Sequence, residues 1–209
     1  MMDKTLMVAK WFCDNNVTVK SASFDGNVLL NKLCYYSKAM FLSLNKNIIQ
    51  KDVQAWKYGP VLPYVYGQYR YDNLLGTNYD ITLSDDEIKI LKIINRVFGY
   101  LKADDISKQT HDEKPWSSLK NQVDKQLNPK ITDESLLDAY KDQMIELYEY
   151  YKDEELNEKV EIINGRYFFI TPDITLTDDE YSELSNANYD DENATYYVSR
   201  DGEGTLMVY

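Results

Sequence analysis

The sequence predicts a mainly α-helical domain of the α+β class, with a short strand pair and an acidic β-hairpin extension at its C-terminus. Three observations support this. Apolar residues recur at helical spacing through much of residues 1–152, and helix-capping signals precede several of these stretches. Hairpin signals are concentrated after residue 153. We therefore expect two regions, a compact helical domain over residues 1–152 and a β-rich extension over residues 153–209.

Charge divides the chain at the same place. Residues 153–209 hold 15 acidic and 3 basic residues, and therefore account for the whole net charge of −12. A surface of this sign repels nucleic acid and anionic membranes, so we do not expect direct nucleic-acid binding by this region. The extension fits either a basic partner surface or a solubilising appendage.

The composition is typical of a cytoplasmic protein without a membrane partner. No apolar run approaches the roughly 20 residues that a membrane-spanning helix needs. The first nine residues contain neither a long apolar segment nor a cleavage site, so secretion is not supported. Cys13 and Cys34 both lie in helix-like apolar patterns, and we interpret them as reduced core residues.

Two helices open the chain. Apolar spacing predicts the first over residues 5–15 and the second over roughly residues 27–45. We expect Asp25-Gly26-Asn27 to be a turn that leads into the second helix.

The segment Asp52–Tyr66 predicts a rigid corner that is rich in aromatic residues. Its start alternates like a strand, Gly59-Pro60 then breaks the backbone, and Pro63 suits the first turn of a helix that fades near residue 72. A second strand over Tyr79–Leu83 could pair with Val53–Trp56. The aromatic rings of the corner either pack beneath a small core or face a partner, since Tyr and Trp dominate binding hot spots.

Local signals place the remaining helices of the domain. Ser84 and Glu87 form a capping-box pattern before an apolar periodic stretch. A short helix is expected over residues 103–111, and a proline corner follows at Glu113–Trp116. Thr132 is expected to cap a long helix that ends near residue 152.

The extension reads as two hairpins with a short helix or turn between them. Asn164-Gly165 favours a type I′ turn between strands 160–163 and 166–170. Thr177–Glu180 repeats the capping-box pattern, and residues 185–193 are polar and loop-like. A second hairpin is expected over residues 196–199 and 206–209.

Searches for chemistry in the sequence lead to no catalytic, metal or cofactor site. His111 is the only histidine, and it lacks a nucleophile pattern, so we expect it to be structural. The acidic turns at residues 190–192 and 201–204 lack a full calcium-binding loop. The run Tyr148–Tyr151 points rings in several directions, which fits either an amphipathic helix or an exposed patch for a protein partner.

Three segments in order resemble one family. Asn31–Ala39 resembles a motif with a Lys-Leu pair followed by two aromatic residues, Ala55–Tyr66 resembles the most diagnostic motif, and Thr110–Trp116 resembles a third. Ile131–Glu134 is similar to the family's closing helix entry, so the resemblance spans roughly residues 5–150. The family is the Panacea domain group, which includes SocA-like and phage-associated GepA-like proteins. The motif residues, expected to be structural or partner-binding, are Lys32, Leu33, Tyr35, Tyr36, Trp56, Tyr58, Gly59, Pro60, Val61, Tyr66, Thr110, His111, Pro115 and Trp116.

The resemblance implies a helical antitoxin domain that neutralises a cognate protein toxin by stoichiometric binding. In one branch of the family the antitoxin resembles an adaptor that hands its toxin to a protease. Residues 153–209 lie outside the shared motifs. Two alternatives therefore stay open: an inhibitor of a host defence protein, encoded by a phage or mobile element, whose acidic tail imitates nucleic acid, and an enzyme that uses His111 with a carboxylate.

Overall fold

The structure is a computed structural model of the chain that describes residues 3–77, 82–187 and 195–209. The chain divides into two units, Met1–Glu154 and Glu155–Tyr209. The first is helical with a small sheet, and the second is a four-stranded sheet with one helix. The predicted fold class, mainly α with some β, is confirmed.

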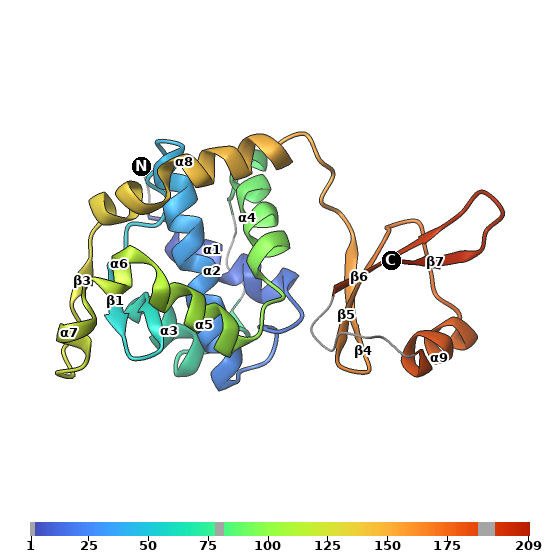
Figure 1. Cartoon of the computed structure of the whole chain (residues 1–209), viewed down its shortest axis with the longest axis horizontal. Coiled ribbons are helices and arrows are strands. Elements are labelled where there is room, and N and C mark those ends of the chain that lie inside the picture. The colour runs from blue at the N-terminus through green and yellow to red at the C-terminus, as the bar shows by residue number, and fades with distance from the viewer. Residues whose placement is uncertain (1–2, 78–81, 188–194) are drawn as a thin grey trace. The chain divides into compact units, whose positions relative to one another are not determined.

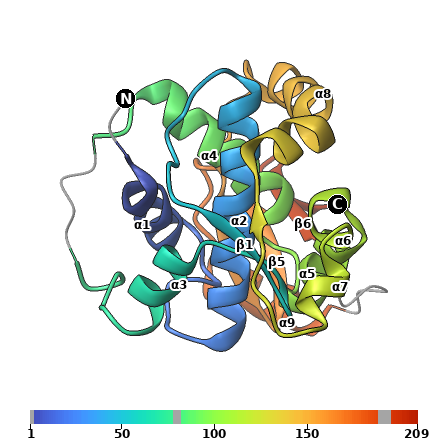
Figure 2. The same cartoon turned by 90° about the vertical axis from the view of Figure 1, so that its left-hand side faces the viewer.

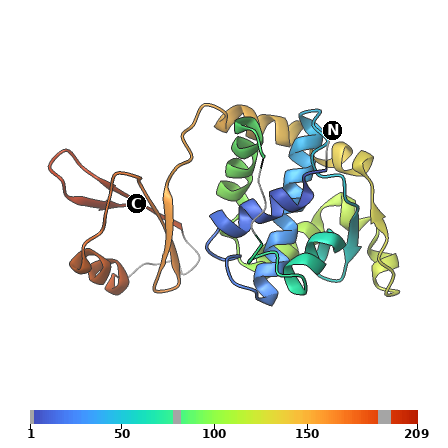
Figure 3. The same ribbon diagram turned by 180° about the vertical axis from the view of Figure 1, so that it is seen from behind.

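Helix α2 (Phe24–Ser43) is the central element of the first unit, and most of its side chains are buried. It packs against α1 (Thr5–Asn15), α4 (Asp85–Phe98), α5 (Ala103–Asp112) and α8 (Asp133–Tyr151). Figure 1 shows α5 in front of α2, and Figure 3, from behind, shows α1 on the opposite side. Because α2 is surrounded in this way, polar side chains such as Asn31, Lys32 and Lys38 are buried on it together with its apolar stripe.

The start of α2 differs from the expectation. The Ser23 hydroxyl accepts a hydrogen bond from the backbone N–H of Gly26 at 2.9 Å, so Ser23 is the N-cap and the helix begins at Phe24. The predicted turn at residues 25–27 is therefore wrong, because these residues form the first turn of the helix. Helix α1 has the bounds that the sequence predicts.

The Asp52–Tyr66 corner contains a hairpin rather than one strand. Strand β1 (Val53–Trp56) pairs antiparallel with β2 (Gly59–Val61) on one side and with β3 (Lys130–Ile131) on the other. Figure 2 shows β1 crossing in front of α2. Of the strand expected over Tyr79–Leu83, residues 79–81 lie outside the described residues, and the other two residues are not in a strand.

Capping signals gave the helix entries correctly. Ser84 and Glu87 form both bonds of the capping box, and the Thr132 side chain accepts a bond from Ser135 N–H. Pro63 lies in the first turn of α3 (Pro63–Arg70). The short helix α6 (Lys114–Ser117) has Pro115 at its start, as expected, whereas α7 (Lys120–Val123) was not predicted.

The second unit joins the two predicted hairpins into one sheet of order β4-β5-β6-β7. Strands β4 (Lys159–Ile163) and β5 (Arg166–Ile170) meet at Asn164 and Gly165, whose φ values of 48° and 78° fit the type I′ turn. Helix α9 (Asp178–Asn186) carries the chain from β5 to β6 (Thr195–Arg200). Strands β5 and β6 are parallel, a pairing that was not predicted, and β6 forms the expected hairpin with β7 (Leu206–Val208).

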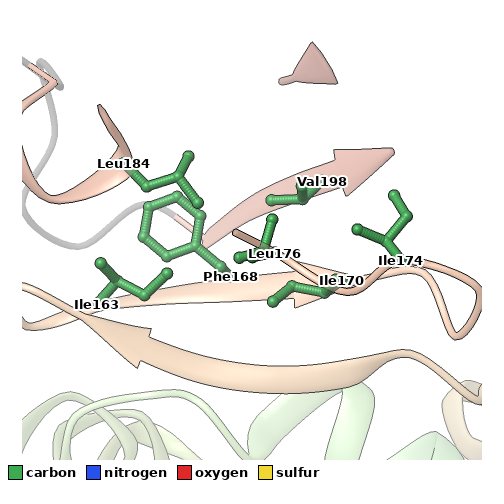
Figure 4. Packing of buried hydrophobic residues seen from close by; sticks show 7 residues of the cluster. All are labelled: Ile163, Phe168, Ile170, Ile174, Leu176, Leu184 and Val198. Atoms are coloured by element: carbon green, nitrogen blue, oxygen red, sulfur yellow. The ribbon is translucent and has the colours of Figure 1, made fainter. Parts of the chain in front are cut away.

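An apolar cluster holds the second unit together. Figure 4 shows Phe168 of β5 between Leu184 of α9 and Ile163 of β4, with Val198 of β6 nearby. Phe168 is fully buried. Because the cluster joins α9 to three strands, this unit has a core of its own.

Candidate partner-binding site

Lys32 is buried at the centre of the family motifs. Its Nζ donates hydrogen bonds to the carbonyl oxygens of Tyr58 and Pro60, at 2.6 and 2.9 Å. Burial lowers the pKa of the Lys32 ammonium group to about 7, and the negative charge of Glu113 partly offsets this shift. Lys32 therefore fastens the β1–β2 hairpin to α2 through backbone carbonyls.

Gly59 brings the hairpin close to this lysine. Its φ of +96° lies in the left-handed region that favours glycine. A Cβ atom at this position would lie 2.7 Å from Thr110 Oγ1 and 2.8 Å from Lys32 Nζ. Three motif residues that are distant in sequence thus meet at one point. We call Lys32, Tyr58, Gly59, Pro60 and Thr110 the hairpin cluster.

Two aromatic residues of the third motif also support the hairpin. Trp116 Nε1 donates a hydrogen bond to the Trp56 carbonyl at 2.9 Å, and the His111 ring stacks on Trp116 with 4.0 Å between centroids. Burial and the positive charge of Lys32 lower the pKa of His111, against a hydrogen bond to the Lys57 backbone that raises it. The His111 ring therefore packs on Trp116, next to the hairpin, in surroundings that disfavour its charged form.

Tyr35 and Tyr36 belong to a separate polar network around Glu113. The Tyr36 hydroxyl donates to Glu113 Oε1 at 2.9 Å, and the Tyr140 hydroxyl donates to Glu113 Oε2. The Tyr35 and Tyr140 hydroxyls lie 2.9 Å apart. Burial raises the pKa of Glu113, while these hydroxyl donors oppose the shift. The network joins α2 and α8 to the start of α6. Gln109 Nε2 also donates a hydrogen bond to the Tyr36 hydroxyl at 3.1 Å. We call this set the tyrosine network (Tyr35, Tyr36, Gln109, Glu113 and Tyr140).

An open pocket of about 300 Å³ lies between α2 and the hairpin. Phe24 and Val28 contribute from α2, Trp56 and Tyr58 from the hairpin, and Tyr66 from α3. Lys32 also lines it, so the pocket and the hairpin cluster share a wall. We call this space the aromatic pocket.

Most motif residues lie in the interior. Trp56, Tyr66 and His111 are partly buried, and Tyr58 is 50 % exposed. The buried motif residues are Lys32, Leu33, Tyr35, Tyr36, Gly59, Pro60, Val61, Thr110, Pro115 and Trp116. Whether the exposed members contact a partner stays a prediction.

Sequence reasoning missed two residues that matter here. Phe24 is 55 % exposed and packs edge-on against Tyr58, with 5.3 Å between ring centroids. Ser23, a residue type that is favoured at N-caps, was the available signal for a helix start at Phe24, but Asp25-Gly26-Asn27 also suits a turn. Glu113 had no comparable signal, because its tyrosine partners lie 77 and 27 residues away in the sequence.

The sequence also singled out the two cysteines, the tyrosine run, and the questions of metal binding and membrane spans. Cys13 and Cys34 are free and buried, and burial raises the pKa of the Cys13 thiol to about 12. In the tyrosine run at the end of α8, Tyr150 is 74 % exposed and its two tyrosine neighbours are partly buried. Within residues 3–77, 82–187 and 195–209, no group of three or more His, Cys, Asp or Glu could hold a metal ion. No helix among these residues is long and apolar enough to span a membrane.

Comparison with known proteins gives one family match. Residues 30–117 match the family model described as the Panacea domain of SocA-like antitoxins. This range is narrower than the expected 5–150, and it contains the hairpin cluster, Glu113 and most of the aromatic pocket. Neither the curated proteins nor the solved structures yield a match.

Proposed function

We propose that this chain, which carries an antitoxin-like Panacea domain at residues 30–117, is an antitoxin that neutralises a cognate protein toxin by stoichiometric binding in the cytoplasm. The family match carries this proposal. The geometry supports it, because the motif residues build a rigid corner with exposed aromatic rings rather than a catalytic constellation. Exposed Tyr and Phe in a preformed hollow suit protein recognition.

The proposal includes the absence of enzymatic activity. A general base must reach the proton that it removes. The Nε2 atom of His111 is buried and has no hydrogen-bond partner in the described part of the chain, and the ring is packed on Trp116. We assign His111 the role of supporting the hairpin.

The acidic extension gives less support to nucleic-acid mimicry. Several of its carboxylates serve the fold of the second unit. Glu180 completes the α9 capping box and pairs with Arg200 at 2.7 Å, and Glu161 accepts a hydrogen bond from Tyr181 at 2.7 Å. These two carboxylates are therefore not free members of an array of phosphate-like charges.

Co-expression with the neighbouring open reading frame tests the proposed function. We expect the neighbour alone to arrest growth, and this chain to restore growth and to co-purify with the neighbour at a fixed ratio. If the neighbouring reading frame on neither side of the gene encodes a product that is toxic when expressed alone, the proposal is contradicted. Repeating the rescue in strains that lack individual cytoplasmic proteases tests the adaptor mechanism, since stoichiometric inhibition needs no protease.

A further inference from the structure

We propose that the aromatic pocket is the docking site for an extended, acidic segment of the toxin, which places one large apolar side chain in the pocket and a carboxylate beside Lys57. This inference rests on the proposed antitoxin function and adds the contact surface and the chemistry of the partner.

The size and lining of the pocket indicate which side chain of the partner can act as the anchor residue, the residue that is inserted into it. A volume of about 300 Å³ lies at the lower limit of sites for small molecules, which makes it suitable for a single bulky side chain. Phe24, Trp56, Tyr58 and Tyr66 contribute aromatic surface, and Val28 adds an aliphatic patch. An inserted Leu, Phe or Trp would contact several rings at once.

The walls are held in place before any partner arrives. Trp56 packs against Tyr66 with 5.2 Å between ring centroids, and its indole Nε1 donates to Gln54 Oε1 at 2.9 Å. The Tyr66 hydroxyl accepts a hydrogen bond from Arg70 at 2.8 Å. Side chains that are already ordered lose little entropy on binding, which favours affinity.

Two of the aromatic residues that line the pocket are also largely exposed to solvent. Phe24 is 55 % exposed and Tyr58 is 50 % exposed, although their rings touch each other. Tyr71, at the end of α3, is 70 % exposed, and its ring lies 6.5 Å from that of Tyr66. A group of exposed aromatic rings on one surface is typical of a protein contact site.

Charge selects an acidic partner. The residues that line the pocket include Lys32 and Lys57 and contain no Asp or Glu, in a chain whose net charge is −12. Lys57 Nζ lies 5.5 Å from the Tyr58 ring centroid, and the Arg70 guanidinium lies 5.8 Å from that of Tyr66. Among the described residues, neither Lys57 nor Arg70 forms an ion pair.

The acidic residues nearest in sequence leave Lys57 as the cation that favours an acidic partner. Asp25 is exposed and follows Phe24 but does not line the pocket. Asp72 lies two residues after Arg70 and its negative charge is not neutralised, because its partner at 2.7 Å is the neutral Gln68 amide, so Arg70 adds little net positive charge. A carboxylate next to the anchor residue would meet Lys57 in a lining that contains no Asp or Glu, which favours capture of an acidic segment.

Selection from a phage-displayed library of random dodecapeptides on the full chain tests the inference directly. We expect enriched peptides to share a Leu, Phe or Trp beside Asp or Glu. Their binding should fall at least tenfold in Val28→Trp, which fills the pocket from a partly exposed position of α2, and in Tyr58→Ala. Tyr150→Ala, which removes an exposed tyrosine from α8, is the matched control and should bind normally.

The charge requirement has its own pair of variants. Lys57→Glu should weaken the enriched peptides about fivefold to tenfold, and Lys125→Glu, the same change at an exposed site outside the pocket, should leave binding unchanged. The inference is overturned by basic peptides, by binding that Val28→Trp and Tyr58→Ala leave intact, or by a selection that enriches no sequence. Thermal unfolding of each variant confirms that it is folded, and light scattering excludes self-association as the source of binding.

Growth rescue separates this inference from the proposed function. If the unmodified chain rescues cells from the toxin and Val28→Trp and Tyr58→Ala do so equally well, the antitoxin function stands and the docking site is wrong. If the unmodified chain rescues nothing, the antitoxin function fails, whereas the peptide selection still decides whether the pocket binds acidic segments.

Discussion

The two units of this chain use charge in opposite ways. In the first unit, Lys32 is buried and its ammonium group is satisfied by two backbone carbonyls, while Glu113 is partly buried beneath tyrosine hydroxyls. In the second unit the charged groups lie near the surface, as in the Glu180–Arg200 pair, and an apolar cluster forms the interior.

This difference indicates what each unit is sensitive to. A buried charge is tolerated only while all its partners are in place, so the first unit should depend on individual hydrogen bonds and on close backbone packing. The second unit should depend on apolar volume and tolerate changes to its surface charges. The predictions below test this contrast, beginning with the largest expected effect.

Removing the ring at the centre of the second unit should have the largest effect. Phe168→Ala should cost about 3–5 kcal/mol because the ring is fully buried among α9 and three strands. Hydrogen exchange should show lost protection after residue 155 and unchanged protection in α2 and α8. Ile162→Ala, at a 51 % exposed position of β4, is the control and should change stability by less than about 0.5 kcal/mol. Loss of protection throughout the chain would show that the two units do not fold independently.

Glycine substitutions compare the turns of the two units. Gly59→Ala should cost about 3 kcal/mol, because the new Cβ meets Thr110 and a lysine that two hydrogen bonds hold in place, at a positive φ. At Gly165 the φ is also positive, at 78°, but a new Cβ would meet no atom within 4 Å. Gly165→Ala should therefore cost about 1 kcal/mol. Gly202→Ala has open space and should be close to neutral. Chemical denaturation measures the unfolding free energies of the three variants. Equal costs at Gly59 and Gly165 would show that the β1–β2 hairpin is not closely packed against Lys32 and Thr110.

Glu113→Ala tests the tyrosine network. The substitution removes the acceptor of the Tyr36 and Tyr140 hydroxyls, and should cost about 2 kcal/mol in the free energy of unfolding. Glu146→Ala, at an exposed position of α8, provides the control and should change stability by less than about 0.5 kcal/mol. If the two variants unfold alike, the hydroxyls find other partners and the network is not structural.

The sequence predicted the parts of the fold that depend on neighbouring residues. The helix entries at Ser84 and Thr132 were correct because each cap and its partner lie three residues apart, and the turn at Asn164-Gly165 was correct for the same reason. Position 24 was missed as the start of α2 since Asp25-Gly26-Asn27 also suits a turn, and only the bond from Gly26 to Ser23 decides between them.

Most of the other features that were not predicted depend on contacts between distant residues. Strand β3 pairs Ile131 with Val53, and β5 pairs with β6 in parallel across α9. Periodicity gives no information on such pairings. The motifs identified three of the rings that line the aromatic pocket, but neither Phe24 nor the position of Lys32 beneath Tyr58 and Pro60 could be inferred from spacing.

The smallest expected effect concerns the pH dependence of stability, and it isolates the charge on Lys32. The pKa of Lys32 is about 7 in the folded chain and near 10.5 in the unfolded chain, so between these values the unfolded state binds more protons. Stability contributed by this group should therefore increase with pH above 7, by up to about 1.4 kcal/mol per pH unit. Lys32→Met removes the titrating amine. The unfolding free energy of the unmodified chain minus that of the variant should therefore increase by about 1–2 kcal/mol from pH 7 to pH 8.5. Cys13 and Cys34 begin to ionise in the unfolded chain at about pH 8.5, but both proteins contain them, so their contribution cancels in the difference. A constant difference would show that the lysine keeps at least its ordinary pKa, and that its two carbonyl partners offset the penalty of burying the charged form.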